Sequence, residues 1–246
     1  MWEVIDYSKC KLNEPVLLEG LPGIGNVGKV VADYILEQQK ESTKIASFFS
    51  YDLPNTVFVN QKNMVNLPKI ELHKASVNGK DYLFLVGDVQ PSDPKSSYLF
   101  TEKVLDIAQE LGCKEIVTLG GIGLSDPPIT SVVYCTGNNE ELINTFVAKG
   151  AKDNIYGVVG PIIGVTGLLM GLSTKRDMKA ITLLAETYSH PMYLGVKEAK
   201  ESLKILNKVY AMDLCFKDLD KEIEDTFKED KELKNAKKIR DVNYIG

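Results

Sequence analysis

The sequence predicts an α/β fold built around a mostly parallel sheet, and two patterns carry this prediction. Short apolar runs, typical of buried strands, alternate with longer segments of helical periodicity, as where 15–19 is followed by 24–39. Several of these runs end in glycine-rich turns, at 20–28, 120–123 and 160–167. Strands that pass through such turns into helices are typical of parallel sheets.

The predicted elements follow one another along the chain without a repeat or a low-complexity segment. Asn78-Gly79 lies between two strand-like runs and is a hairpin signal, so part of the sheet could be antiparallel or mixed. Pro94 suits the first position of a helix. The expected strands are 15–19, 45–50, 57–59, 64–72, 82–86, 115–119, 132–136, 155–159 and 178–185, and the expected helices are 24–39, 94–111, 138–149, a segment that contains Gly164, 197–212 and 219–238.

The domain organisation is predicted from the change in composition near the C-terminus. Residues 1–216 alternate between strand-like and helix-like segments, and no interdomain linker interrupts them. Residues 217–246 contain a densely charged segment that is expected to form a helical extension, followed by a short tail. The prediction is therefore one α/β domain over 1–216 and a C-terminal helical extension over 217–246.

Composition indicates which kinds of partner and which cellular compartment to expect. The chain of 246 residues has a formal net charge of −5, and no basic face is visible, so nucleic acid is not expected as a partner. The four cysteines stand far apart and there are only two histidines, which predicts reduced thiols, no metal site and no bound cofactor. These features predict a soluble cytoplasmic protein.

One uncharged segment, 155–174, is long enough to cross a membrane. It contains five glycines and Pro161 and ends in Thr174-Lys175-Arg176-Asp177. A strand, a Gly-Pro turn and a buried helix explain the segment equally well. We therefore expect no membrane association.

The sharpest local motif is a G-x-G-x-x-G pattern formed by Gly23, Gly25 and Gly28, which follows a strand and opens a helix. Such glycines let backbone amides approach an anion at a helix N-terminus, so nucleotide binding is one interpretation. The other is a turn whose glycines allow close packing, because no ribose-binding acid follows the second strand. Both interpretations stay open from the sequence, with close packing favoured.

Further candidates stand at the predicted carboxyl edge of the sheet, where ligands bind in open α/β folds. Gly121 and Gly164 lie in two more glycine turns, and Asp88 and Glu186 end two strands, so all four could line one ligand cleft with the first motif. The alternative is that the two carboxylates cap local turns. The sequence shows no nucleophile with a base, so no catalytic residue is assigned and enzymatic activity is not expected.

Taken together and in order, the glycine turns resemble the archaeal branch of the proteasome assembly chaperone family. The resemblance covers roughly residues 15–200. It is carried by four segments, EGLPGIGNVG at 19–28, LGG at 119–121, GPIIGVTGL at 160–168 and LLAET at 183–187.

The resemblance implies a three-layer α/β/α fold like that of nucleoside phosphorylases, without established catalysis. It also implies a homo-oligomer that assists or binds proteasome α subunits. Some proteasome partners dock a C-terminal tail with tyrosine second from the end, whereas this chain ends in Tyr244-Ile245-Gly246, with tyrosine third from the end. The tail could dock on a partner or fold back on its own domain. The alternative function is an enzyme or sensor that binds a nucleoside, a nucleotide or another anion in the glycine-lined cleft.

Overall fold

The computed structural model describes residues 2–157, 160–221 and 223. The chain divides into two compact units, Met1–Leu214 and Cys215–Gly246. In the second unit, 217–221 and 223 are helical. The rest of the helix expected over 219–238, and the tail Tyr244-Ile245-Gly246, lie outside the described residues. The domain boundary near 216 stays a prediction.

The first unit is built on an eight-stranded sheet in the order β1-β3-β6-β7-β2-β8-β10-β9. The four central strands β7, β2, β8 and β10 are parallel, and the outer pairs on both sides are antiparallel. The strands are β1 Glu3–Ile5, β2 Val16–Gly20, β3 Thr43–Phe49, β6 Ile70–Val77, β7 Lys80–Gly87, β8 Glu115–Leu124, β9 Val133–Gly137 and β10 Lys179–Tyr188, with a separate two-stranded pair of β4 Phe58–Val59 and β5 Val65–Asn66.

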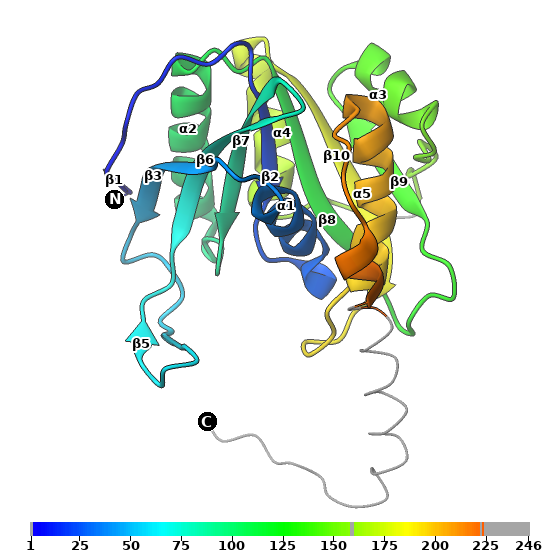
Figure 1. The fold of residues 1–246 in the computed structure, drawn as a ribbon, viewed down its shortest axis with the longest axis horizontal. Helices are drawn as coiled ribbons and strands as arrows, with labels where there is room; N and C mark the ends of the chain where they lie inside the picture. The colour runs from blue at the N-terminus through cyan, green and yellow to red at the C-terminus, as the bar shows by residue number, and fades with distance from the viewer. Residues whose placement is uncertain (1, 158–159, 222, 224–246) are drawn as a thin grey trace, which may run out of the picture. The chain divides into compact units, whose positions relative to one another are not determined.

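Helices cover both faces of this sheet (Figure 1). Helices α1 and α5 pack together on one face, and α2 and α4 pack together on the other. Helix α3 lies against β9 and β10 at one edge. Their bounds are α1 Val27–Glu37, α2 Pro94–Glu110, α3 Glu140–Val147, α4 Val165–Ser173 and α5 Val196–Tyr210, with short 3₁₀ turns at Ile24–Asn26 and Thr174–Arg176. The predicted α/β fold with three layers is confirmed.

The central strands are apolar along their whole length because helices cover both of their faces. Leu17 and Leu18, which point to opposite faces of β2, are both fully buried. Strand β1 was not predicted, since it is only three residues long and mostly exposed. The preceding Trp2 anchors it, because the indole Nε1 donates to Ser96 Oγ at 2.9 Å and the ring packs on Phe100 with centroids 4.6 Å apart.

Two further expectations concern the middle of the chain. The hairpin between β6 and β7 turns at Asn78-Gly79 as predicted. The strand predicted over 155–159 is wrong for 155–157, which form no strand; in this region Lys152 instead makes an isolated bridge to Tyr134 of β9. Residues 158–159 lie outside the described part. In that described part no helix is both long and apolar enough to cross a membrane.

Candidate functional site

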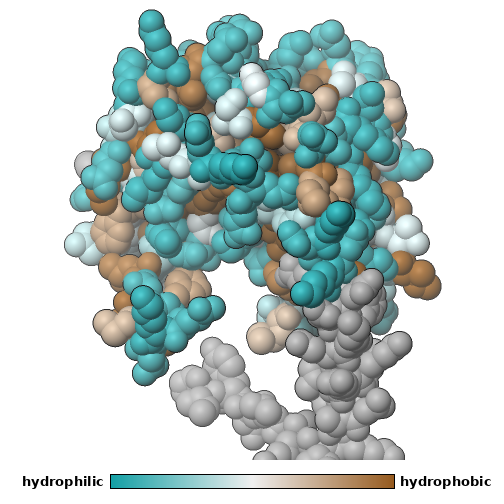
Figure 2. Space-filling model, in the orientation of Figure 1, coloured by the Kyte–Doolittle hydropathy of each residue, from teal (hydrophilic) through white to brown (hydrophobic). Residues whose placement is uncertain are grey.

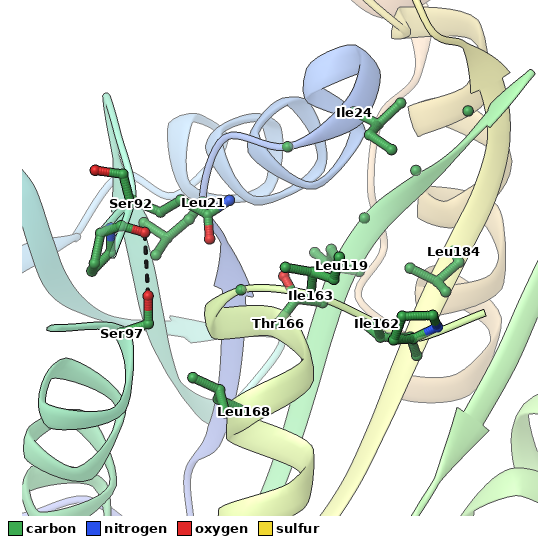
Figure 3. Close-up of a pocket in the computed structure, with 18 of the residues that line it drawn as sticks. Leu21, Ile24, Ser92, Ser97, Leu119, Ile162, Ile163, Thr166, Leu168 and Leu184 are labelled. Carbon is green, nitrogen blue, oxygen red and sulfur yellow. Dashed lines mark hydrogen bonds between the residues drawn. The ribbon is translucent and has the colours of Figure 1, made fainter. Parts of the chain in front are cut away.

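Four segments of the chain meet at the carboxyl edge of the central strands and, with the start of α2 and Leu184 of β10, line an open cavity of about 870 Å³ (Figure 3). They are the turn after β2, the loop after β7, the end of β8 and the approach to α4. Ligands bind at this edge in open α/β sheets. The described residues that line the cavity are Leu21, Gly23, Ile24, Gln90, Pro91, Ser92, Pro94, Ser97, Tyr98, Leu119, Gly120, Gly121, Ile122, Gly123, Gly160, Pro161, Ile162, Ile163, Gly164, Thr166, Leu168 and Leu184.

The described lining is largely apolar and carries no charged side chain. No aspartate, glutamate, lysine, arginine, histidine or cysteine is among the described residues that line the cavity. Leucine and isoleucine side chains form most of the wall that Figure 3 shows. Of the polar side chains, Ser97 uses its hydroxyl internally, because Oγ donates to the backbone oxygens of Asp93 at 2.9 Å and Pro91 at 3.3 Å. The lining therefore contains no nucleophile paired with a base.

Gln90 fixes two of the four segments to one another. Its Nε2 donates to the backbone oxygen of Pro22 at 2.7 Å, in the turn after β2. Its Oε1 accepts from the backbone N–H of Val165 at 3.3 Å, at the start of α4. A single neutral amide thus joins the β2 turn to the N-terminus of α4 across the cavity.

A buried carboxyl group, that of Glu19, supports the cavity next to Thr166. Glu19 has no solvent exposure. Its Oε1 accepts from the backbone N–H of Leu21 at 3.0 Å, and its Oε2 accepts from Thr166 Oγ at 3.1 Å. Burial raises the pKa of Glu19 to about 7, although these hydrogen bonds favour the ionised form. The described structure places no cation against this carboxyl.

Two glycines of the G-x-G-x-x-G motif are required by close packing. A Cβ on Gly28 would lie 2.3 Å from the backbone oxygen of Leu119, so only glycine lets α1 approach β8 this closely. Gly25 has φ +62°, and a Cβ there would lie 2.5 Å from Thr187 Oγ. Gly23 differs, since a Cβ there would meet nothing within 4 Å. The close-packing expectation therefore fits Gly25 and Gly28 and is wrong for Gly23.

The structure separates the predicted cleft residues into groups. Gly23, Gly121 and Gly164 line the large cavity. Gly25 lines a smaller neighbouring hollow of about 220 Å³, together with His190. Gly28 is buried between α1 and β8.

The two predicted carboxylates are not among the lining residues. Asp88 Oδ2 accepts from the backbone N–H of Lys69 at 3.3 Å, and Glu186 Oε2 accepts from that of Val132 at 3.3 Å. Both carboxylates thus bond to segments that are distant in sequence, so the alternative that they cap local turns is wrong. Sequence reasoning instead passed over Glu19, Gln90 and Thr166. The available signal was the single charge of Glu19 at the end of the apolar run at 15–18.

A second apolar feature protrudes from the connection between β3 and β6. We call residues 55–67 the hairpin arm; it carries β4 and β5. Asn60 shapes its tip, because Oδ1 accepts from the backbone N–H groups of Lys62 and Met64 at 2.9 and 3.1 Å. Figure 2 shows hydrophobic residues gathered around this arm, at the lower left. The exposed apolar side chains are Val57, Phe58, Val59, Met64, Val65 and Leu67, and Lys62 is the only charged residue of the arm.

A family model matches most of the chain. The match is to the PAC2 family and spans residues 17–234. The chain belongs to the PAC2 family. The resemblance to proteasome assembly chaperones, inferred from the ordered glycine turns, is thereby confirmed, since solved structures of such homologues also share the fold.

Several relatives of this PAC2 family protein match along nearly their whole length. An uncharacterised protein of Methanocaldococcus jannaschii is 27% identical over 248 residues, with 96% of this chain and 93% of that protein covered. The crystal structure of Pyrococcus furiosus PbaB, an archaeal proteasome activator, has a TM-score of 0.84 and 26% identity over 95% of this chain and 98% of that one. Pyrococcus furiosus PbaA, an archaeal homolog of proteasome-assembly chaperone, shares the fold with a TM-score of 0.73 and 19% identity, over 93% and 94%.

Proposed function

We propose that this PAC2 family protein is a non-enzymatic binding factor for proteasome α subunits, acting as a homo-oligomer in the archaeal cytoplasm. The observation that carries the proposal is the match to PbaB, which is described as an archaeal proteasome activator and is similar in sequence and fold over both whole chains. The cavity lining supports a non-enzymatic role because its described residues offer no nucleophile with a base.

The hairpin arm supplies a surface of the kind that protein partners use. It presents six exposed apolar side chains within thirteen residues. Apolar side chains gathered on a protruding segment are typical of interaction sites rather than of an isolated soluble surface. A two-stranded hairpin is also only marginally stable alone, so docking against a partner would stabilise it. We therefore assign the arm to contact with the α subunits.

The test is the affinity of the full chain for recombinant α-subunit rings from the same organism, measured by biolayer interferometry. The decisive variant combines Val59→Lys with Val65→Glu, which are opposite each other across β4 and β5. This pair removes apolar surface while keeping the net charge and a favourable cross-strand pair. The matched control combines Ile129→Lys with Tyr156→Glu, two exposed residues outside the arm.

We expect the arm variant to weaken ring binding at least about tenfold and the control to leave it unchanged. Full-strength binding by the arm variant would remove the arm from the interface. Failure of the unmodified chain to bind α-subunit rings would overturn the proposed function itself.

The tail and the oligomeric state are tested separately. If Tyr244-Ile245-Gly246 docks on the α ring, deleting these residues lowers ring affinity about tenfold without changing the melting temperature. Lost stability with intact binding would show that the tail packs on its own domain. Light scattering should give a mass that is a multiple of the 27.3 kDa chain, and a mass of one chain at micromolar concentration would contradict self-association.

A further inference from the structure

We propose that the cavity at the carboxyl edge of the sheet binds an uncharged, largely apolar small molecule that donates a hydrogen bond to Thr166. This site is distinct from the hairpin arm and does not depend on the proposed proteasome interaction. Four features support the assignment: the size of the cavity, its fixed walls, its lack of charge and the orientation of the Thr166 hydroxyl.

The size and construction fit a small-molecule site. Its volume of about 870 Å³ lies within the range of about 300–1,000 Å³ that is usual for ligand pockets. Gln90 joins the β2 turn to α4, and the contact of Gly28 with Leu119 fixes α1 against β8. The walls are therefore held together before a ligand enters, which reduces the entropy lost on binding.

The charge distribution selects a neutral ligand. No charged side chain is among the described residues that line the cavity, so a phosphate or sulfonate would have no side-chain cation as its partner. The carboxyl of Glu19, one hydrogen bond behind Thr166, would repel an anion when ionised. The Val165 N–H at the start of α4, a usual position for anion binding, already donates to the neutral Gln90 amide. The geometry disfavours nucleotides.

Thr166 provides a hydrogen-bond acceptor that can orient a ligand in the cavity. It lies in the first turn of α4 among the lining residues (Figure 3). When Glu19 is ionised, Thr166 Oγ donates its only hydrogen to Glu19 Oε2 at 3.1 Å. The lone pairs of Oγ remain as acceptors, so the group that complements them is a hydroxyl or N–H donor on the ligand. An apolar ligand body matches the leucine and isoleucine side chains that form most of the remaining wall.

The test uses N-phenylnaphthylamine, an uncharged aromatic probe with one N–H donor whose fluorescence rises in apolar surroundings. Anilinonaphthalene sulfonate, of similar shape but anionic, and ATP serve as charged probes. Gly23→Phe places a ring in the cavity at a position where a Cβ meets nothing and the backbone is extended. Gly171→Phe is the matched control, since Gly171 is also open and does not line the cavity.

We expect one saturable site per chain for the uncharged probe, weakened at least about tenfold by Gly23→Phe and unchanged by Gly171→Phe. The sulfonate should bind this Gly23-dependent site at least about tenfold more weakly than the neutral probe, and ATP should not compete. Binding of the neutral probe that is insensitive to Gly23→Phe, or equal binding of the sulfonate there, would overturn the proposal. Circular dichroism establishes that each variant is folded.

Two further variants keep the test decisive if Gly23→Phe does not fold. Ile163→Asp places a charge on an exposed side chain of the lining and should weaken the neutral probe about tenfold. Thr166→Val keeps the shape of the side chain but removes the acceptor, and should weaken the probe about threefold to tenfold. Unchanged affinity in both variants would place the probe elsewhere and refute the site.

Discussion

The cavity and the hairpin arm are both apolar, but they are built in opposite ways. The cavity is concave, its walls come from several segments of the chain, and glycine contacts and the Gln90 amide fix these walls. The arm protrudes from the link between β3 and β6, and within the described part of the chain its two strands pair only with each other. The apolar side chains of the cavity are therefore held in place by the surrounding domain, whereas those of the arm lie on a protruding hairpin.

This difference separates two kinds of recognition. A preformed concave site loses little entropy on binding and selects by shape and hydrogen bonding, which suits a small molecule. A protruding hairpin with exposed apolar side chains on both strands suits a large surface that covers it. The comparison predicts that substitutions at the packed positions that support the cavity walls change stability strongly, whereas substitutions on the arm change binding and leave stability almost unaltered.

The largest expected effect comes from Gly28→Ala. The new Cβ would lie 2.3 Å from the Leu119 backbone oxygen, and backbone atoms cannot rotate away as a side chain can. We expect the free energy of unfolding, measured in urea, to fall by at least about 3 kcal/mol. Gly23→Ala is the control and should change it by less than about 1 kcal/mol, because that position is open. Equal effects would refute the packing explanation.

The second effect concerns the buried carboxyl of Glu19, which is hydrogen-bonded to the lining residue Thr166. Because the pKa of Glu19 is raised to about 7 in the folded protein, the neutral form is favoured by folding. The contribution of neutral Glu19 to the free energy of unfolding is complete below the unfolded pKa near 4.5, and it is lost as pH rises through about 7. The shift corresponds to at most about 3 kcal/mol.

Glu19→Gln removes this ionisation and tests it. The stability of the variant relative to the unmodified protein should increase as pH rises from about 4.5 to 8, as measured by urea unfolding at several pH values. Other carboxylates titrate in both proteins. The difference between the two free energies of unfolding, followed against pH, therefore reports on Glu19 alone. A difference that does not vary with pH would show that Glu19 titrates normally.

The smallest effect on stability is expected on the hairpin arm. Val59 and Val65 are 63% and 65% exposed, so replacing them by lysine and glutamate removes little buried surface. The free energy of unfolding should change by less than about 0.5 kcal/mol. A larger loss would mean that the arm packs on its own domain, and the contrast with the cavity would then fail.

The fold was largely predictable because its central strands have a strong local signal. Leu17 and Leu18 stand in a continuous apolar run, and this run enters a glycine turn and a helix. Strand β1 was not predictable, because the residue before it, Trp2, is held by a contact with the distant Ser96. The exposure of the apolar side chains on the arm was also not predictable. A strand-like apolar pattern is the same whether helices cover the strand or leave it exposed.

The sequence by itself determined the α/β class, the glycine turns and the family resemblance, because each depends on residues close together in the chain. Only the tertiary structure decided which turns share the cavity, that Gly23 lines it while Gly28 is packed against β8, and that Asp88 and Glu186 do not line it. It also brought Thr166 to Glu19 across 147 positions of sequence. The physical reason is that strand order and side-chain direction arise from long-range pairing and packing, which local sequence patterns do not encode.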